Sequence, residues 1–178
     1  MVAFLAWIPA TAGSENPNLP NFQKVDEHVY RGAQPEPEGF KELAALGIKT
    51  VIDLRQIGEH SQADEQKAVT ALGMRYVSIP MKGLSEPKDD LVASVEAILN
   101  NPADGPVFVH CKRGADRTGT VIAVYRISHD GWENKKALQE AKSYGMSMFE
   151  RAMQHYVIDY KPRALEASSA SGAHGAAQ

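Results

Sequence analysis

The chain has 178 residues, of which 43% are hydrophobic and 23% charged, a composition typical of one compact globular domain. This excludes a large multidomain protein and a globally disordered chain. Nineteen Lys and Arg residues against 22 Asp and Glu residues give a formal net charge of -3. That balance removes the general attraction of a basic domain for nucleic acid, so we expect no nucleic-acid partner and a local basic site for any anionic ligand.

Cysteine and histidine usage limits the chemistry further. Cys111 is the one cysteine of the chain, which excludes an intramolecular disulfide and a zinc site built from several thiolates. The six histidines are scattered, and no pair has the spacing of metal ligands on one helix face. We therefore predict no metal ion.

The first residues resemble the end of a secretory signal. A short apolar run ends in the small residues Ala10, Thr11 and Ala12, but the basic segment that usually precedes such a run is absent. We favour export to the periplasm or medium over a cytoplasmic location. The run is too short for an integral membrane span. Residues 13–21 are turn formers and are predicted to be a linker, so residues 1–21 are assigned as a signal-like segment and linker.

Helical and extended patterns alternate through the next part of the chain. Helical apolar spacing, Gly residues at predicted helix ends and short β-branched runs define the elements. They are, in order, a strand at 29–31, a helix at 39–46 closed by Gly47, a strand at 48–54, a helix at 61–72 closed by Gly73, and a strand at 74–79.

The second half continues the alternation with a helix at 87–99, a strand at 107–109, and helices at 118–129, 133–144 and near 148–156. Residues 164–178 are small and polar without periodicity and are predicted to be a disordered tail, which leaves residues 22–163 as one domain. The pattern predicts an α/β fold of three layers, with a mostly parallel central sheet flanked by helices. We expect a monomer.

The segment after the strand at 107–109 carries the chemistry. Ligands of such sheets bind beyond the carboxyl ends of the strands, and residues 111–117, here called the Cys111 loop, leave one of these ends. A loop between a strand and a helix start directs several backbone N–H groups at one point, and the helix dipole adds positive charge there. Arg117 closes this oxyanion site with a planar two-donor fork. The predicted phosphate-binding residues are Lys112, Arg113, Gly114, Ala115, Asp116, Arg117 and Thr118.

The same surroundings act on the Cys111 sulfur. A thiol at a helix N-terminus beside several cations ionises below its free pKa of about 8.5, so we expect a thiolate at neutral pH. A thiolate in line with a phosphate ester is a covalent nucleophile, which predicts phosphoryl transfer through a cysteinyl-phosphate. Thr118 is expected to donate its hydroxyl to the sulfur, and His110 to position the loop. Thiolate, loop amides and Arg117 supply this chemistry without a cofactor.

The residues His110, Cys111, Gly114, Arg117, Thr118 and Gly119 resemble the His-Cys-x5-Arg-Thr-Gly signature of the cysteine-dependent protein tyrosine phosphatase superfamily. The short chain resembles its dual-specificity branch. Segments at 29–35, 50–55 and 76–80 are similar to bacterial and plant-fungal atypical dual-specificity phosphatases, so the likeness spans residues 25–145. The resemblance implies a protein tyrosine phosphatase-like fold and hydrolysis of phosphate monoesters.

The general acid that protonates the leaving oxygen has two candidate locations. Many superfamily members take an Asp from a separate loop before the Cys. The candidates in that loop here are Glu86, Asp89 and Asp90, although Asp89 and Asp90 are also explained as first-turn acids of the next helix. The rival is Asp116, because an Asp-Arg-Thr ending resembles myotubularin-type lipid phosphatases and a group of bacterial tyrosine phosphatases. We favour Asp116; the alternative is that it only orients Arg113 or Arg117.

The substrate has two candidate classes. Lys112 resembles the residue after the Cys in phosphoinositide-directed members, which makes a phosphoinositide or inositol phosphate the alternative substrate. A phosphorylated protein, with phosphotyrosine first, is favoured because the surface as a whole does not attract anions at a sequence pI of about 6.1. Arg55 follows a predicted strand and either supports the Cys111 loop, contacts a substrate phosphate or forms an ion pair at the sheet edge.

Two alternative functions belong to other classes of protein. One is a catalytically silent phosphate-binding module, which the intact Cys111, Arg117 and Thr118 argue against. The other is sulfur transfer by a rhodanese-like loop, which also uses a single Cys in an anion-binding nest but is disfavoured by the Arg-Thr-Gly ending.

Overall fold

The computed structural model of the protein describes residues 16–162, which contain a five-stranded sheet of order β1-β2-β5-β3-β4. The strands are β1 (Gln23–Lys24), β2 (Val29–Gly32), β3 (Thr50–Asp53), β4 (Arg75–Ser78) and β5 (Val107–His110). β2, β5, β3 and β4 run parallel, and β1 adds to β2 in the antiparallel direction. The predicted α/β fold with a mostly parallel sheet is therefore confirmed.

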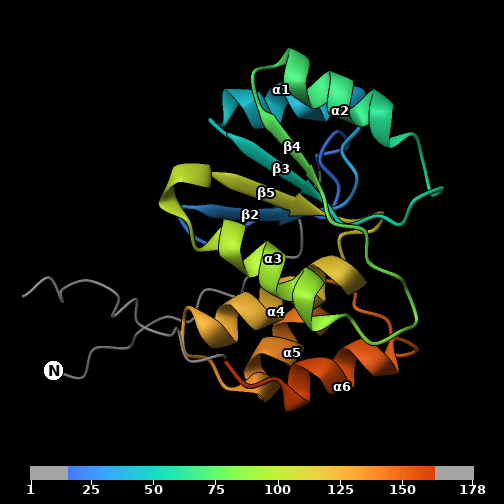
Figure 1. The fold of residues 1–178 in the computed structure, drawn as a ribbon, viewed down its shortest axis with the longest axis vertical. Helices are drawn as coiled ribbons and strands as arrows, with labels where there is room; N and C mark the ends of the chain where they lie inside the picture. The colour runs from blue at the N-terminus through green and yellow to red at the C-terminus, as the bar shows by residue number, and fades with distance from the viewer. Residues whose placement is uncertain (1–15, 163–178) are drawn as a thin grey trace, which may run out of the picture.

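Helices cover both faces of this sheet. The helical elements are α1 (Pro37–Ala45), α2 (Gln62–Ala71), α3 (Asp89–Leu99), the 3-10 helix η1 (Pro102–Asp104), α4 (Asp116–Ser128), α5 (Asn134–Ser143) and α6 (Arg151–Asp159). Figure 1 shows α1 and α2 on one side of the strands and α3 to α6 on the other, which gives the three predicted layers. Among the described residues no helix is long and apolar enough to cross a membrane.

Local signals explain most element boundaries. Pro37 occupies the first turn of α1, where its missing N–H is not needed. The Ser61 side chain caps α2 by accepting a hydrogen bond from the Asp64 N–H at 3.3 Å. Gly47 and Gly73 follow two helix ends at φ +82° and +79°, a left-handed conformation that other residues adopt only with strain.

Several elements differ from the sequence predictions: α1 begins two residues before the predicted 39, and β3 and α3 begin two residues after the predicted 48 and 87. The short β1 and η1 were not predicted, because two or three residues carry no periodicity. Helix α4 begins two residues earlier than the predicted Thr118, and its N-cap is Ala115, which offers no side-chain cap and so no sequence signal. Helix α6 lies three residues further along the chain than predicted, because residues 146–150 form a connecting segment before it.

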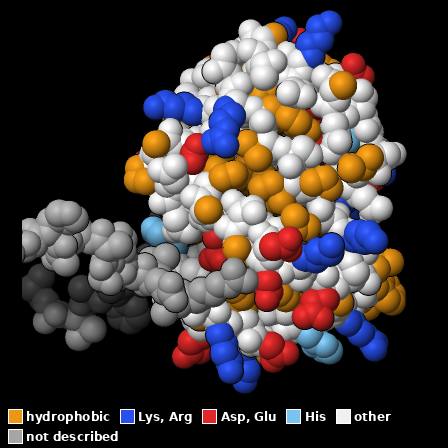
Figure 2. All heavy atoms as spheres, viewed as in Figure 1, with side chains coloured by type: hydrophobic (Ala, Val, Ile, Leu, Met, Phe, Trp, Pro, Cys, Tyr) orange, Lys and Arg blue, Asp and Glu red, His pale blue; other side chains and the backbone are white. Residues whose placement is uncertain are grey.

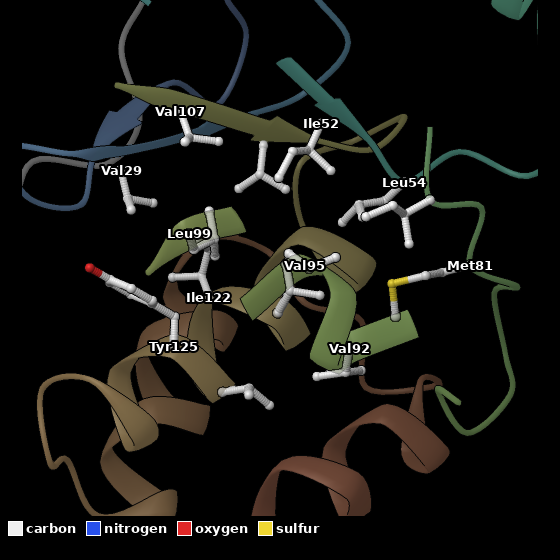
Figure 3. Close-up of a cluster of buried hydrophobic side chains, with 14 of the residues drawn as sticks. Val29, Ile52, Leu54, Met81, Val92, Val95, Leu99, Val107, Ile122 and Tyr125 are labelled. Carbon is white, nitrogen blue, oxygen red and sulfur yellow. The ribbon is translucent and has the colours of Figure 1, made fainter. Parts of the chain in front are cut away.

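Two apolar layers enclose the sheet. On the side of α3 and α4, Figure 3 shows side chains such as Ile52, Val95 and Ile122 directed into one cluster, and all three are completely buried. On the side of α1 and α2, a second cluster includes Leu43 and Phe108. The strand β5 contributes to both clusters, because all four of its residues are buried and alternate residues face opposite sides.

The domain begins before residue 22, contrary to the prediction of a linker at 13–21. Leu19 is only 2% exposed and belongs to the cluster beneath α1 and α2. The amides of Asn16 and Asn18 donate to the Glu42 carboxylate of α1 at 2.5 Å and 2.7 Å. The signal-like residues 1–15 and the predicted tail at 164–178 lie outside the described residues.

The surface agrees with the nearly balanced composition. Figure 2 shows basic and acidic side chains at the top and bottom of the face in view and hydrophobic side chains gathered across its middle. No single sign of charge dominates this face, as the net charge of -3 predicts.

Candidate active site

Cys111 follows the last residue of β5, the middle strand of the sheet, and the Cys111 loop leads directly into α4. The sulfur-bearing residue is 1% exposed. Because α4 begins at Asp116, Arg117 lies in the first helical turn and the backbone N–H groups of this turn face the end of the loop. The structure therefore builds the predicted strand, loop and helix start in one place, with the helix closer to Cys111 than expected.

The Cys111 loop is supported from outside by residues of the N-terminal segment. The Asn21 side-chain amide donates to the carbonyl of Arg113 at 3.1 Å. The Arg31 guanidinium donates to the carbonyl of Gly114 at 2.6 Å. Gly114 adopts φ +66°, and a β-carbon there would lie 2.4 Å from the backbone of Gly32. Glycine is therefore required at position 114 by both conformation and space.

Arg117 is buried to 8% exposure and is held by groups from two neighbouring loops. Its Nη2 donates to Glu59 Oε1 at 3.2 Å, and its Nη1 donates to the carbonyls of Leu54 and Met81 at 3.5 Å and 3.4 Å. Burial works in the opposite direction, but the ion pair with Glu59 and the nearby Cys111 sulfur raise the pKa of Arg117. Arg117 is thus a permanent cation oriented beside the predicted nucleophile.

Sequence reasoning missed Glu59, which was placed in a turn without a functional signal. Burial acts against the effect, but the hydrogen bond from Arg117 holds the pKa of Glu59 below its usual value, so it is ionised at neutral pH. The signal that would have found it is topological. Glu59 follows β3, and parallel neighbours such as β3 and β5 deliver the loops after their carboxyl ends to the same edge of the sheet.

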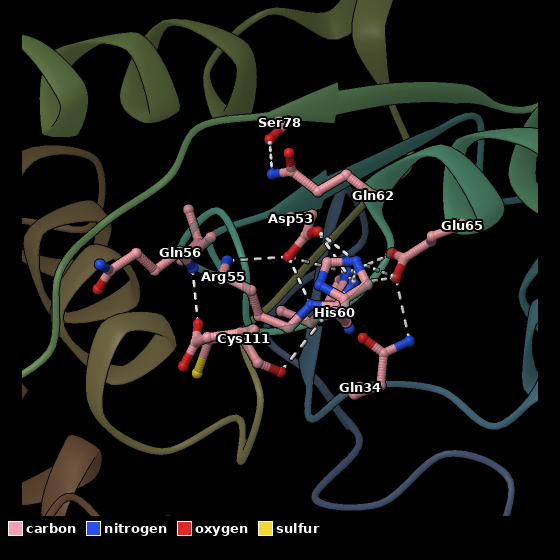
Figure 4. A network of polar contacts seen from close by, with 12 residues as sticks. Gln34, Asp53, Arg55, Gln56, His60, Gln62, Glu65, Ser78 and Cys111 are labelled. Carbon is pink, nitrogen blue, oxygen red and sulfur yellow. Dashed lines mark hydrogen bonds and ion pairs between the residues drawn. The ribbon is translucent and has the colours of Figure 1, made fainter.

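A second charged group, the rear charged cluster, lies behind the Cys111 loop (Figure 4). It consists of Asp53, Arg55, His60, Glu65 and His110. Arg55 donates to both oxygens of Asp53 at 2.9 Å and also contacts Glu65. Of the three roles considered for Arg55, the structure therefore shows the ion pair at the sheet edge.

His110 connects the rear charged cluster to the nucleophile. Its ring is completely buried, with Nε2 at 2.9 Å from Glu65 Oε1 and Nδ1 at 3.4 Å from the Cys111 carbonyl oxygen. Burial raises the pKa of Glu65, but the hydrogen bond from His110 outweighs it and the net effect is a lowered pKa. His110 is placed to position the loop, in line with its predicted role.

Three members of the rear charged cluster have the types and spacing of metal ligands. Atoms of Asp53, Glu65 and His110 lie within 4.8 Å of one another. The Arg55 guanidinium occupies the same carboxylate oxygens, and it supplies the positive charge that two buried carboxylates require. The contacts of these side chains are accounted for without a metal ion, and the absence of a metal stays a prediction.

Asp116 is buried, and both of its carboxylate oxygens accept hydrogen bonds. Oδ1 accepts from the Ser147 N–H at 2.8 Å, and Oδ2 contacts the Arg113 guanidinium. This geometry matches the alternative in which Asp116 orients Arg113, and the general-acid role stays a prediction.

The rival acids lie at the start of α3. Asp89 and Asp90 are first-turn residues of this helix, as the alternative explanation expected. Asp89 accepts a hydrogen bond from the Tyr156 hydroxyl at 2.9 Å. Together with Glu86 it lines a groove of about 760 Å³ between α3 and α6 that includes no residue of the Cys111 loop. In the segment between β4 and α3, the carbonyl of Met81 accepts a hydrogen bond from Arg117. Met81 lies near the beginning of this segment, whereas Asp89 follows its end.

The other predicted phosphate-binding residues divide by exposure. Lys112 and Arg113 are exposed, whereas Gly114, Ala115 and Thr118 are buried. The Thr118 hydroxyl has no hydrogen-bond partner among residues 16–162, so its predicted bond to the Cys111 sulfur is not formed in this structure.

This arrangement, a buried cysteine after the central strand with an arginine six residues later in the first turn of a helix, is that of the cysteine-dependent protein tyrosine phosphatase superfamily. Residues 5–159 match the family described as a DSP-PTPase phosphatase fused to NAD+ kinase. The chain belongs to this family.

Relatives with described functions fall into two groups. The dual specificity protein phosphatase TpbA of Pseudomonas aeruginosa is 28% identical over 137 residues, which cover 77% of this chain. The inositol diphosphatase DSP5 of Arabidopsis thaliana is 28% identical over 146 residues, which cover 79% of this chain and 70% of DSP5. The chain spans 60% of the length of TpbA.

Solved structures show the same fold. The crystal structure of Pseudomonas aeruginosa TpbA superimposes with a TM-score of 0.71 at 29% identity, covering 86% of this chain and 92% of that chain. The catalytic core of the PP-IP phosphatase SIW14 from Saccharomyces cerevisiae, in complex with citrate, gives a TM-score of 0.72 at 25% identity, covering 80% and 87%. The protein tyrosine phosphatase-like fold predicted from the sequence is confirmed.

Proposed function

We propose that this protein is a phosphatase that hydrolyses phosphate monoesters of proteins, phosphotyrosine first, through a cysteinyl-phosphate on Cys111. The observation that carries the proposal is the placement of Cys111 at the end of the central strand, with the N-terminus of α4 and the Arg117 cation directed at the same point. Fixed donors at the position where charge develops are the largest single source of catalysis in such sites.

The reaction has two steps. The Cys111 thiolate attacks phosphorus, so that the S–P bond forms while the bond to the ester oxygen breaks, and the leaving oxygen takes a proton from the general acid. Water then attacks phosphorus, the S–P electron pair returns to sulfur, and inorganic phosphate leaves. Arg117 and the loop amides hold the phosphoryl oxygens in both steps. Asp116 is our proposed acid, with Asp89, Asp90 and Glu86 as the alternatives.

The surroundings of the Cys111 loop support a substrate with apolar parts. Three segments contact Arg117 or Asp116 through Glu59, the Met81 carbonyl and the Ser147 N–H. Each segment also carries large exposed hydrophobic side chains, here called the apolar rim: Ile57, Leu84, Met148 and Phe149, all 72–75% exposed. The Leu84 N–H donates a hydrogen bond to the carboxylate of Glu150, the neighbour of Phe149, at 2.8 Å. This contact brings two of these segments together.

An apolar rim beside a phosphate site suits a phosphorylated side chain in a polypeptide, because neighbouring residues bury hydrophobic surface as the phosphate enters. A soluble inositol phosphate has no such surface. TpbA, which is named a dual specificity protein phosphatase, and a crystal structure of a TpbA variant with pTyr support the same substrate class.

An inositol phosphate is the second candidate. Lys112 and Arg113 are exposed on the Cys111 loop, where they offer charge to additional phosphate groups. The relatives from Arabidopsis thaliana and Saccharomyces cerevisiae are named inositol diphosphatases. Arg113 shares its guanidinium with Asp116, which reduces the positive charge available to such a ligand.

The test is phosphate release by the wild type and by Cys111→Ser from an aryl phosphate, a phosphotyrosine peptide and inositol phosphates. We expect the wild type to act on the first two and Cys111→Ser to lose roughly 10⁴-fold or more of kcat, since removal of a nucleophile in other enzymes has effects of this size. A wild type that releases no phosphate from any substrate contradicts the proposal. A preference for inositol phosphates over the peptide favours the second candidate.

A further inference from the structure

Arg31 is a buried cation that the reaction described above does not use. It lies in β2 within the segment at 29–35 and is 1% exposed. Its Nη2 donates to the Gly114 carbonyl of the Cys111 loop at 2.6 Å, and its guanidinium lies over the Tyr144 ring with Cζ 4.2 Å from the ring centre. Arg31 therefore connects the sheet to the far side of the Cys111 loop.

The charge of Arg31 is not paired directly with a carboxylate, although Glu140 acts on it through space. Among residues 16–162 no ion pair involves Arg31, and its Nε and Nη1 groups are buried without a hydrogen-bond partner. By contrast, Arg55 and Arg126 each have two carboxylate partners. A buried charge without a counter-charge is strongly unfavourable, so its retention requires a compensating interaction. The contact with the Tyr144 ring supplies only part of this compensating interaction.

The Cys111 loop is a further source of negative charge beside Arg31. The segment that carries Arg31 contacts the loop directly, because the Gln34 N–H donates to the Lys112 carbonyl at 3.3 Å and Gly32 packs against Gly114. The two anions that this loop is built to hold are the Cys111 thiolate and a substrate phosphoryl group. Burial lowers the pKa of Arg31 to about 10, so the guanidinium still carries its charge at neutral pH. Glu140, Tyr144 and Cys111 act to raise this pKa, in that order, and Arg126 acts to lower it.

Arg31 also fixes the direction of the loop amides. The C=O and N–H groups of a trans peptide unit point in opposite directions. A Gly114 carbonyl held toward β2 therefore turns the N–H of the next residue, Ala115, away from the strand. A planar guanidinium held over the Tyr144 ring fixes the direction of this donor, whereas the flexible ammonium of a lysine does not.

We propose that Arg31 is a positioning residue that orients the Gly114 peptide group and places a permanent positive charge beneath the Cys111 loop, which stabilises the thiolate and a bound oxyanion. This deepens the proposed function and rests on it. The charge and the orientation are separable, because Gln retains a planar donor without charge and Lys retains charge without the planar fork.

The experiment measures the pH dependence of Cys111 alkylation by iodoacetamide, together with inhibition by vanadate, in the wild type, Arg31→Gln and Arg31→Lys. We expect Arg31→Gln to raise the midpoint of alkylation by about one pH unit and the inhibition constant for vanadate by about tenfold. Arg31→Lys is expected to keep a midpoint close to wild type while lowering kcat, since charge remains and orientation is lost.

The matched control is Arg126→Gln. Arg126 is half-buried and lies 4.6 Å from the centre of the Trp132 ring, but it is paired with Asp130 and Glu140. This change is expected to lower the thermal midpoint without moving the alkylation midpoint. The comparison separates a general loss of stability from an effect on the sulfur.

Two results would overturn the inference. One is a folded Arg31→Gln variant with the wild-type alkylation midpoint and vanadate inhibition. The other is an Arg31→Lys variant whose alkylation midpoint rises by about the one pH unit expected for Arg31→Gln, although its charge is retained. This second result decides the matter if Arg31→Gln does not fold. Alkylation needs no turnover, so a wild type that alkylates at low pH but releases no phosphate would contradict the proposed function and leave the role of Arg31 intact.

Discussion

The Cys111 loop lies between two groups of charged side chains that differ in exposure. Behind it, the carboxylates and the arginine of the rear charged cluster have side chains 0–4% exposed and are paired with one another. In front of it, the Arg113 side chain is 62% exposed and Glu59, the partner of Arg117, is 31% exposed. The first group is closed to solvent, and the second is partly exposed to it.

We expect this difference to separate the charges that stabilise the fold from those that act on a substrate. A buried charge that loses its partner remains buried, so the cost falls on folding. An exposed charge that loses its partner is solvated by water, so the cost in stability is small. We therefore expect substitutions in the rear charged cluster to act mainly on the free energy of unfolding and substitutions in front of the loop to act mainly on turnover.

The largest expected effect on stability is that of Glu65→Ala. It removes the hydrogen-bond partner of the buried His110 Nε2 and one of the two carboxylate partners of the buried Arg55. We expect it to lower the free energy of unfolding by about 3–5 kcal/mol, measured by urea denaturation. Glu59→Ala is the comparison, because Glu59 is itself partly exposed and the buried Arg117 retains its two carbonyl contacts. Its cost is expected to be smaller, about 1–2 kcal/mol. Equal costs for the two variants would remove the distinction between the two groups.

Asp116→Asn is expected to lower kcat for a phosphotyrosine peptide by about 10²-fold and to remove the alkaline limb of the pH profile, because an amide cannot donate the acid proton. The measurement is kcat across pH, with Asp89→Asn alongside as the variant expected to keep the wild-type profile. If the limb disappears in Asp89→Asn instead, the acid lies at the start of α3, and Asp116 serves to orient Arg113.

The rear charged cluster also predicts a pH dependence of stability. Burial raises the pKa of Asp53, but the hydrogen bond from Arg55 outweighs it, and the pKa values of both Asp53 and Glu65 are lowered in the folded protein. Their stabilisation is full above the unfolded-state pKa values of about 3.9 and 4.3 and is lost as pH falls through the folded values. Urea denaturation from pH 7 to pH 3 should show this loss, with a shallower slope in Glu65→Gln. The same slope in both proteins would show that Glu65 does not contribute.

The smallest expected effect is that of Phe149→Ser in the apolar rim. Loss of one hydrophobic contact is expected to lower kcat/KM for a phosphotyrosine peptide with apolar neighbours by about tenfold, and to leave hydrolysis of a small aryl phosphate unchanged. Leu46→Ser, at an exposed leucine at the end of α1, is the control. An equal loss on both substrates would show that Phe149 supports the catalytic loop and not a peptide.

Most of the architecture followed from local patterns. The apolar runs at 48–54 and 107–109 and the helix-ending glycines predicted the alternation of strands and helices, and the Cys-to-Arg spacing predicted a nucleophile and its phosphate clamp. These features are encoded within a few residues of one another, because periodicity and capping act over one or two turns. The boundaries of α4 and α6 lacked such signals and were placed two or three residues away.

The partners of the Cys111 loop were decided only by the tertiary structure. Glu59, Glu65 and Arg31 are 46 to 80 residues from Cys111 in the chain and carry no local motif that points to it. Parallel pairing of β2, β5 and β3 brings the segments after their carboxyl ends to one edge, where burial decides which charges must be paired. The sequence by itself identified the candidate reactive residues through a local motif, and the packing of distant strands determined which side chains orient and balance them.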